Sequence, residues 1–302
     1  MTSKVLFAFP GQGAQRPGML RDIPNRDRWM KIAERVLGRD LTELDSKDSL
    51  VRSQSVQLCL LIKGVSYSES LINEGVLPDI NCGLSIGAYA AAVASGSLRF
   101  EDALQLVNLR GSLMDRACPS GYGMTAIMGL RLNTVESICA SIKELYVANY
   151  NAETQIVVAG SEAAMKKAVE VAYAIGAEKC VRLRVSVPSH CPLMEGIVPE
   201  LEERMKTIIL SRPKRAYLSA TTGRLIWDPK LIASDLVHNM ACRTQWHEAV
   251  ACACERGVRL AIEVPPGSVL TRLIRLFSSE VRAVSLAETS ISDVGYLFRG
   301  LS

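Results

Sequence analysis

The apolar residues of this chain alternate between short unbroken runs and longer stretches with helical spacing. Residues 5–9 form an uninterrupted apolar run that ends at a Pro-Gly pair, as is typical of a buried parallel strand. Apolar positions at helical spacing follow over residues 29–37, 53–73 and 100–116. Strands that alternate with helices in this way predict an α/β fold with a parallel sheet.

The pattern changes near residue 123, where shorter elements predict a second structural unit. In chain order we expect strand, helix, strand, strand, helix and strand at 124–129, 134–145, 146–149, 155–159, 162–175 and 179–187. This βαββαβ order is typical of a small ferredoxin-like subdomain. We therefore expect a large α/β subdomain of residues 1–122 and 191–302, with the small subdomain, residues 123–190, inserted into it. After the insert, strands are expected at 215–219 and 259–264, and helices at 235–240, at 246–256 and after the turn at 265–268.

Composition and charge narrow the class of protein. The chain has 302 residues, 48% of them apolar and 22% charged, and a net charge of +4 that is spread along the sequence. This mild, scattered charge gives no reason to expect nucleic acid as a partner. No apolar run is long enough to span a bilayer, and the first residues lack a signal-peptide pattern. The nine cysteines include no C-x-x-C pair, so we expect reduced thiols, no metal site and a cytoplasmic location.

The motif Gly-Leu-Ser-Ile-Gly at residues 83–87 is the strongest chemical signal. It follows a short apolar approach and precedes an alanine-rich helical run, which is the context of a nucleophile elbow. Such a turn holds the Ser85 hydroxyl clear of the sheet, at the positive end of the next helix. The backbone N–H of Ile86 would then point toward the oxyanion of a tetrahedral intermediate.

A serine nucleophile needs a base, and the chain offers three histidines. His190 lies between two prolines after a predicted strand, where α/β proteins place working groups. His238 and His247 lie in helical patterns, where a histidine is more often structural. We therefore favour His190, although no acid stands out to orient it. The open alternative is a hydrolase that uses His238 or His247, with Asp228 or Asp235 as its acid.

Two further features remain ambiguous on the residues alone. Gly11-Gln12-Gly13 begins like a dinucleotide-binding loop, but Arg16 stands where the third glycine is needed, so that fingerprint fails. The loop is then either a plain turn or a second oxyanion contact beside the elbow. Arg110 either forms an ion pair at the surface or, if it points into the site, binds a substrate carboxylate with two N–H groups of its planar guanidinium.

Five motifs in register resemble the malonyl-CoA:acyl-carrier-protein transacylase family. They are Phe-Pro-Gly-Gln-Gly-Ala-Gln at 9–15, Gly-Leu-Ser-Ile-Gly at 83–87, Arg-Gly at 110–111, Val-Pro-Ser-His at 187–190 and Gln-Trp at 245–246. The resemblance implies a hydrolase-like core in the large subdomain, beside the ferredoxin-like one. It also implies transfer of malonyl from malonyl-CoA to an acyl carrier protein, with no bound cofactor.

The resemblance further assigns a role to each motif. Ser85 would be acylated, and His190 would be its general base. The backbone carbonyl of Gln245 would orient His190. The N–H groups of Gln12 and Ile86 would form the oxyanion hole, and Arg110 would hold the malonyl carboxylate. Asn149 and Asn151 fall where the family lines its cleft, so they are candidate substrate-binding residues.

Within the family, the chain is most similar to the epsilon subunits of bacterial malonate decarboxylases. Leu84 stands where most members have histidine, and Pro265-Pro266-Gly267 stands where Gly-Pro-Gly is usual. That branch implies a dedicated carrier subunit as partner, with a phosphoribosyl-dephospho-CoA arm in place of phosphopantetheine. The alternatives are a transacylase of fatty-acid or polyketide synthesis, a serine thioesterase, and a non-catalytic subunit that docks the carrier.

Overall fold

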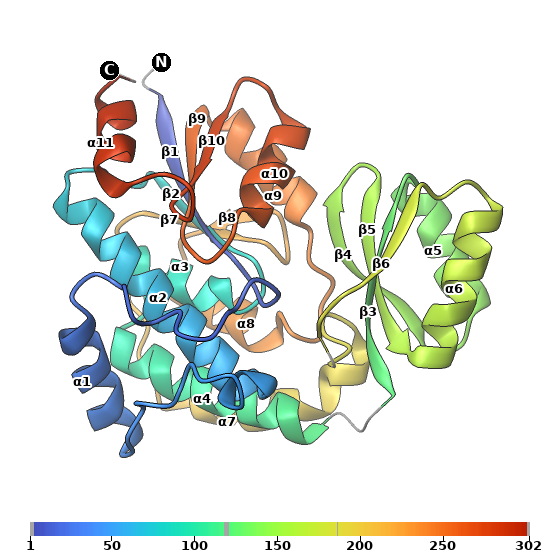
Figure 1. Cartoon of the computed structure of the whole chain (residues 1–302), viewed down its shortest axis with the longest axis horizontal. Helices are drawn as coiled ribbons and strands as arrows, with labels where there is room; N and C mark the ends of the chain where they lie inside the picture. Colours follow the sequence, from blue (N-terminus) through green and yellow to red (C-terminus); the bar gives the residue numbers. More distant parts are fainter. Residues whose placement is uncertain (1–2, 118–120, 186, 301–302) are drawn as a thin grey trace.

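Two β-sheets organise the molecule, one in each of two units that lie side by side (Figure 1). The computed structural model describes residues 3–117, 121–185 and 187–300. The larger sheet belongs to the unit that holds both ends of the described chain, and the smaller sheet is formed by an internal segment.

The larger sheet has six strands in the order β10-β9-β1-β2-β7-β8. All of its neighbours pair parallel except β7 and β8, which pair antiparallel. The central strand β1 is flanked by β2 on one side and β9 on the other, so the chain changes direction across the sheet there. Ligands bind beside such a switch point, at the carboxyl ends of the strands. The strands are β1 (Lys4–Phe9), β2 (Ile80–Gly83), β7 (Ala216–Ser219), β8 (Arg224–Ile226), β9 (Val258–Glu263) and β10 (Arg282–Ser285).

Helices cover both faces of this sheet, because residues on both faces of its strands are apolar. On β1, Phe7 and Phe9 pack into a core with the helices of one face, whereas Leu6 and Ala8 pack into a second core beneath α9 and α10. The helices of the larger unit are α1 (Arg26–Leu37), α2 (Ser53–Asn73), α3 (Gly87–Ala94), α4 (Phe100–Ala117), α7 (Val198–Lys206), α8 (Pro229–His238), α9 (Trp246–Glu255), α10 (Val269–Phe277) and α11 (Ile291–Arg299).

The second unit confirms the predicted βαββαβ order. Its four strands pair antiparallel in the order β4-β5-β3-β6, and helices α5 and α6 cover one face. This is the ferredoxin-like arrangement, so the fold class predicted from the sequence is confirmed, whereas the boundary residues of the two subdomains stay a prediction. The elements are β3 (Tyr122–Met128), α5 (Leu132–Ser141), β4 (Leu145–Ala152), β5 (Gln155–Ser161), α6 (Glu162–Ala174) and β6 (Lys179–Arg182).

The predicted strand at 179–187 is too long, because β6 ends at Arg182. The Arg182 guanidinium donates hydrogen bonds to the main-chain oxygens of Tyr122 and Met124 in β3, and to that of Val185. A side chain thus holds the next residues against the sheet in place of a strand ladder. Strands β8 and β10 and helices α7 and α11 were not predicted.

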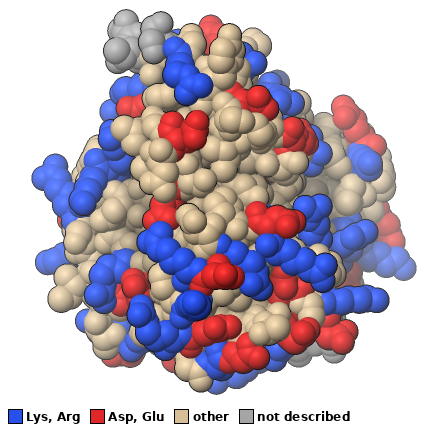
Figure 2. Space-filling view, turned by 60° about the vertical axis from the view of Figure 1, so that its left-hand side comes forward, with Lys and Arg blue, Asp and Glu red and all other residues tan. Residues whose placement is uncertain are grey.

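Figure 2 shows the face of the molecule on which α1 lies, and side chains of both charges are interspersed there. This agrees with the scattered charge of the sequence. None of the helices in the described ranges is both long enough and apolar enough to cross a membrane.

Candidate active site

Ser85 occupies a tight turn between β2 and α3, with a left-handed φ of 56°. The flanking glycines make this turn sterically possible. A Cβ atom on Gly83 would overlap the backbone of Gly87, and one on Gly87 would overlap the carbonyl oxygen of Phe9. Because strain of this kind persists only where the surrounding structure imposes it, the turn fits the elbow that the motif predicts.

The loop after β1 lies directly beside this elbow. A Cβ atom on Gly11 would come within 3.2 Å of the Leu84 carbonyl oxygen and 3.7 Å of the Ser85 Cβ. Gln12 follows at the same edge of the sheet and accepts a hydrogen bond of 3.2 Å from Gln57 Nε2 through its side-chain oxygen. The sequence left two interpretations of this loop, a plain turn and a second oxyanion contact. Its position beside the elbow is compatible with the second.

His190 is buried and held in one orientation by the residues after α8. Its backbone, with φ of 65°, donates from N–H to the Met240 carbonyl at 2.6 Å. Its ring Nδ1 lies 2.7 Å from the Asn239 carbonyl oxygen. The predicted role of Gln245 is therefore wrong, since the orienting carbonyl belongs to Asn239. A free carbonyl at a helix end can only accept, and α8 ends one residue before Asn239.

The environment of His190 keeps its imidazole neutral. Burial, and after it the nearby charge of Arg110, together lower the pKa of His190 to about 4, although hydrogen bonds to main-chain atoms of Asn239 and Cys242 act in the opposite direction. Because Nδ1 must donate to the Asn239 carbonyl, the neutral ring presents an unprotonated Nε2. A neutral imidazole whose Nε2 carries the lone pair is the form that a general base requires.

Arg110 is completely buried beneath the elbow, and the surface interpretation is excluded. It donates from Nη1 to Gln57 Oε1 at 2.6 Å, and from Nη2 to Ser85 Oγ at 3.3 Å and Asn239 Oδ1 at 3.2 Å. Within the described part of the chain, no carboxylate forms an ion pair with this guanidinium. Burial lowers the pKa of Arg110, and an unpaired buried cation is costly unless a ligand supplies the anion.

Gln57 and Asn239 join the predicted residues into one hydrogen-bonded set, and sequence reasoning missed both. Gln57, on α2, connects Arg110 to Gln12, and Asn239 connects Arg110 to His190. Gln57 is fully buried in a long helix, so an internal glutamine in an apolar run was the only available signal. Asn239 offered none, because its link to His190 uses a main-chain atom that every residue possesses.

Asn149 and Asn151 reach the site from β4 of the smaller unit. Both are at least nine-tenths buried, with exposed fractions of 7% and 8%, and the Oδ1 atom of each lacks a hydrogen-bond partner among the described residues. Buried polar atoms are normally paired, so two unpaired oxygens facing one cavity indicate a place for a donor from a ligand.

A cavity of about 370 Å³ between the two units brings the candidate residues together. Ser85 and Gln12 line it from the larger unit, Asn149 and Asn151 from the smaller, and His190 from the segment that connects the two. Arg110 and Ile86 are buried behind Ser85. Gln245 and the other two histidines do not line this cavity.

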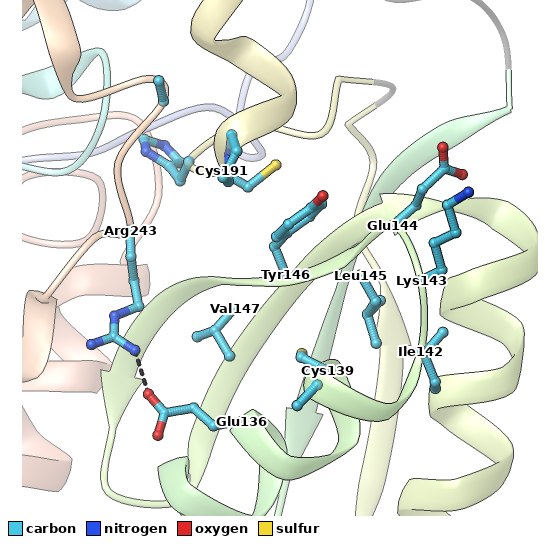
Figure 3. Close-up of a pocket in the computed structure, with 14 residues that line it drawn as sticks. Glu136, Cys139, Ile142, Lys143, Glu144, Leu145, Tyr146, Val147, Cys191 and Arg243 are labelled. Atoms are coloured by element: carbon cyan, nitrogen blue, oxygen red, sulfur yellow. Dashed lines mark hydrogen bonds and ion pairs between the residues drawn. The ribbon is translucent and has the colours of Figure 1, made fainter.

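His190 also borders a second hollow, whose other lining residues are drawn in Figure 3. That hollow lies between the α5–β4 edge and the residues around Cys191 and Arg243. The Arg243 guanidinium forms a 2.6 Å ion pair with Glu136 across it, which ties the two units together. No cluster of described His, Cys, Asp or Glu side chains here or elsewhere could hold a metal ion.

The geometry disfavours the hydrolase alternative. Asp235 is buried and accepts hydrogen bonds from Tyr217 at 2.5 Å and Ser219 at 2.7 Å, so its oxygens are already occupied. His238 bonds to the Ser234 carbonyl within its own helix. His247 packs against the rings of Tyr150 and Phe277. The set that remains is a serine hydroxyl on a strained turn, a neutral imidazole and a buried cation, an arrangement that suits acyl transfer from a carboxylate-bearing donor.

Comparison with known proteins gives consistent relatives. The acyl transferase domain family matches residues 6–295. The chain is 32% identical to the malonyl CoA-acyl carrier protein transacylase of Haemophilus influenzae, with 95% of this chain and 96% of that protein covered. It is 33% identical to the protein of the same name from Staphylococcus aureus, over 94% of this chain and 96% of that one.

Solved structures agree with these sequence matches. FabD from Acinetobacter baumannii superposes with a TM-score of 0.93 at 29% identity, covering 100% of both chains. A malonyl-transacylase in complex with its type II PKS acyl-carrier protein superposes with a TM-score of 0.91 at 30% identity, covering 97% of this chain and 99% of that one. The similarity therefore extends over both units of the fold.

Proposed function

Since this chain belongs to the malonyl-CoA:acyl-carrier-protein transacylase family of acyltransferases, we propose that it transfers malonyl from malonyl-CoA to the thiol of an acyl carrier protein through a malonyl-Ser85 intermediate. One observation carries the malonyl assignment. The buried Arg110 guanidinium lies 3.3 Å from the Ser85 hydroxyl and has no carboxylate partner among the described residues. A donor with a terminal carboxylate would supply the missing anion.

In the first half-reaction, His190 Nε2 takes the proton from Ser85 Oγ as that oxygen attacks the thioester carbonyl carbon. The carbon–sulfur bond then breaks, and the CoA thiolate leaves with the proton from Nε2. In the second half-reaction, the carrier thiol gives its proton to Nε2 and attacks the acyl-serine. The Ser85–acyl bond breaks, and Ser85 Oγ recovers the proton.

The charge that forms on the thioester oxygen needs donors on both sides of the elbow. We assign this role to the backbone N–H groups of Gln12 and Ile86. The support is positional: the loop after β1 touches Leu84 and Ser85, and Ile86 caps the amino terminus of α3. Such donors cost no reorganisation during the reaction and each contributes roughly 100- to 1000-fold in rate.

Arg110 is the proposed carboxylate clamp, and Asn149 and Asn151 the proposed contacts for the arm of the thioester. The unpaired oxygens of these two asparagines can accept from the amide N–H groups of a pantetheine arm. The cavity itself, whose lining includes the apolar side chains of Met124, Ala126 and Val157, would limit the access of water to the acyl-serine, so the intermediate should persist for many turnover times without an acceptor.

A carrier of fatty-acid or polyketide synthesis, with a phosphopantetheine arm, is the acceptor that the relatives favour. The carrier of a malonate decarboxylase, with its phosphoribosyl-dephospho-CoA arm, is the second candidate. Two departures from the usual family pattern favour it: Leu84 borders the cavity beside the nucleophile, and Pro265-Pro266 forms the turn after β9.

The deciding experiment measures the intact mass of the protein after brief exposure to malonyl-CoA, before and after a carrier is added. The wild type should gain one malonyl group, and Ser85→Ala should gain none. Ser97→Ala, which changes a buried serine outside the cavity, is the matched control and should be acylated normally. The carrier that discharges the adduct identifies the acceptor.

Each other outcome contradicts the proposal in a different way. Rapid loss of the adduct to water without any carrier would indicate a thioesterase. An adduct on Ser85→Ala would place the nucleophile elsewhere. Carrier binding without any adduct on the wild type would indicate a docking subunit that has lost the activity.

A further inference from the structure

Asn239 contacts both the proposed base and the proposed carboxylate clamp, with different atoms. Its main-chain oxygen accepts from His190 Nδ1 at 2.7 Å, and its side-chain Oδ1 accepts from Arg110 Nη2 at 3.2 Å. The residue is 3% exposed and follows directly after α8, with its own N–H bonded to the Asp235 carbonyl at 2.9 Å. Its position is therefore fixed by the helix and not by the substrate site.

Two hydrogen-bond donors at this point have no partner within the described part of the chain. They are Nδ2 of Asn239 and Nε of Arg110, and both atoms are fully buried. Leaving such donors unpaired costs free energy, so native proteins seldom do so outside functional sites. Because Oδ1 of the same amide accepts from Arg110 Nη2, which also donates to Ser85 Oγ at 3.3 Å, the unpaired Nδ2 belongs to a side chain that adjoins both the guanidinium and the nucleophile elbow.

We propose that the side-chain amide of Asn239 is a specificity-determining group that donates from Nδ2 to the terminal carboxylate of the acyl donor, together with Arg110. A carboxylate has two oxygens and about four lone-pair sites, so it can accept from Arg110 and from Asn239 at once. This inference rests on the proposed malonyl transfer and adds a second residue to the selection of the malonyl group.

The absence of charge on the Asn239 amide is as important for the carboxylate clamp as the hydrogen bond that the amide would donate. An aspartate at position 239 would place an anion against Arg110, satisfy the guanidinium and repel a substrate carboxylate. The asparagine holds Arg110 through Oδ1 without neutralising it, so the positive charge remains available to the ligand. Gln57 likewise holds Arg110 without neutralising it, because its amide oxygen accepts from Arg110 Nη1 at 2.6 Å.

The test compares three acyl donors: malonyl-CoA, acetyl-CoA and malonamyl-CoA, in which a neutral amide replaces the carboxylate. The measured quantity is kcat/KM for acylation of Ser85, for the wild type, Asn239→Asp and Asn239→Ala. Asn108→Asp, which makes the same change at a residue bonded only outside the cavity, is the matched control.

Asn239→Ala should lower kcat/KM for malonyl-CoA by roughly 10- to 100-fold and leave acetyl-CoA nearly unchanged, because only the donor with a carboxylate loses a hydrogen bond. Asn239→Asp should lower kcat/KM for malonyl-CoA further. This variant should prefer malonamyl-CoA to malonyl-CoA, since its new carboxylate can accept a hydrogen bond from the substrate amide. A merely structural role for Asn239 cannot produce that reversal. The main-chain bond to His190 survives in both variants.

The inference is overturned if both variants keep the wild-type ratio of malonyl to acetyl transfer, or if both donors are lost equally in folded protein. Folding is checked by the near-ultraviolet circular dichroism of each variant. The proposed function is judged separately, by whether the wild type forms the malonyl adduct at all. A wild type that is malonylated, with variants that keep its selectivity, would refute only the role of Asn239.

Discussion

The Asn239 carbonyl oxygen lies 2.7 Å from Nδ1 of His190, and this contact decides which ring nitrogen carries the proton. A carbonyl oxygen can only accept, so Nδ1 donates and Nε2 is left as the basic atom. In serine hydrolases a buried carboxylate commonly orients the histidine. Here a neutral carbonyl does so, and it stabilises an imidazolium less than an anion would.

The first prediction concerns pH. The proposed base works only when neutral, and burial together with the Arg110 charge lowers the pKa of His190 to about 4. We therefore expect kcat/KM for acylation to be flat near neutral pH and to fall only as the pH approaches that value, as measured by stopped-flow acylation with malonyl-CoA. Arg110→Ala removes one of the two causes, so its acid limb should move to higher pH. A wild-type limb near pH 6.5, the ordinary value, would contradict this account.

The second prediction concerns Arg110 and acyl selectivity. Arg110→Ala should lower kcat/KM for malonyl-CoA by at least about 100-fold, because the substrate carboxylate would be buried without its partner. Transfer from acetyl-CoA should change far less, so the acetyl-to-malonyl ratio should rise. Arg99→Ala removes an exposed arginine paired with Asp102 and should leave the ratio alone. An unchanged ratio in Arg110→Ala would exclude the clamp.

The third prediction tests the elbow by stability. Gly87→Ala would place a Cβ against the Phe9 carbonyl oxygen, so we expect a loss above about 4 kcal/mol in the free energy of unfolding, or no folded protein. Gly196→Ala is the control, since nothing lies within 4 Å of a Cβ there, and it should change stability by less than about 0.5 kcal/mol. Denaturant unfolding measures both. Equal stability of the two variants would show that the turn can relax.

The fourth prediction concerns Leu84 and the choice of carrier. Leu84→His restores the residue that most family members have, at a position that borders the cavity. If Leu84 adapts the site to a decarboxylase carrier, the variant should discharge its malonyl group faster to a phosphopantetheine carrier and more slowly to the other one. Discharge rates from the preformed malonyl adduct give the comparison. Equal effects on both carriers would remove Leu84 from the question of partner choice.

Local patterns predicted most of the fold because they depend on neighbouring residues. The apolar run of β1, the helical spacing of α2 and the βαββαβ order of the smaller unit all appear in the structure. The end of β6 did not follow from its pattern. There the Arg182 side chain donates hydrogen bonds to carbonyl oxygens of β3 and of Val185. A contact of this kind between distant segments cannot be predicted from the alternation of apolar and polar residues.

The site divides in the same way. The elbow at Ser85 and the histidine between prolines could be singled out from residue type and neighbours, whereas Arg110 was assigned only through the family resemblance. The partner of His190 could not, and Gln245 was the wrong choice, because the atom that orients the ring is a main-chain oxygen. Gln57 also escaped notice, since its role depends on α2 passing between Gln12 and Arg110.

The sequence by itself therefore determined the family, the α/β and ferredoxin-like units and the three side chains on which the proposed chemistry depends. Tertiary structure alone decided that Arg110 is buried without an anion, that Asn239 holds His190, and that two asparagines of β4 face Ser85 across one cavity. The physical reason is that motifs record local backbone constraints, whereas pairing and desolvation depend on which distant segments meet.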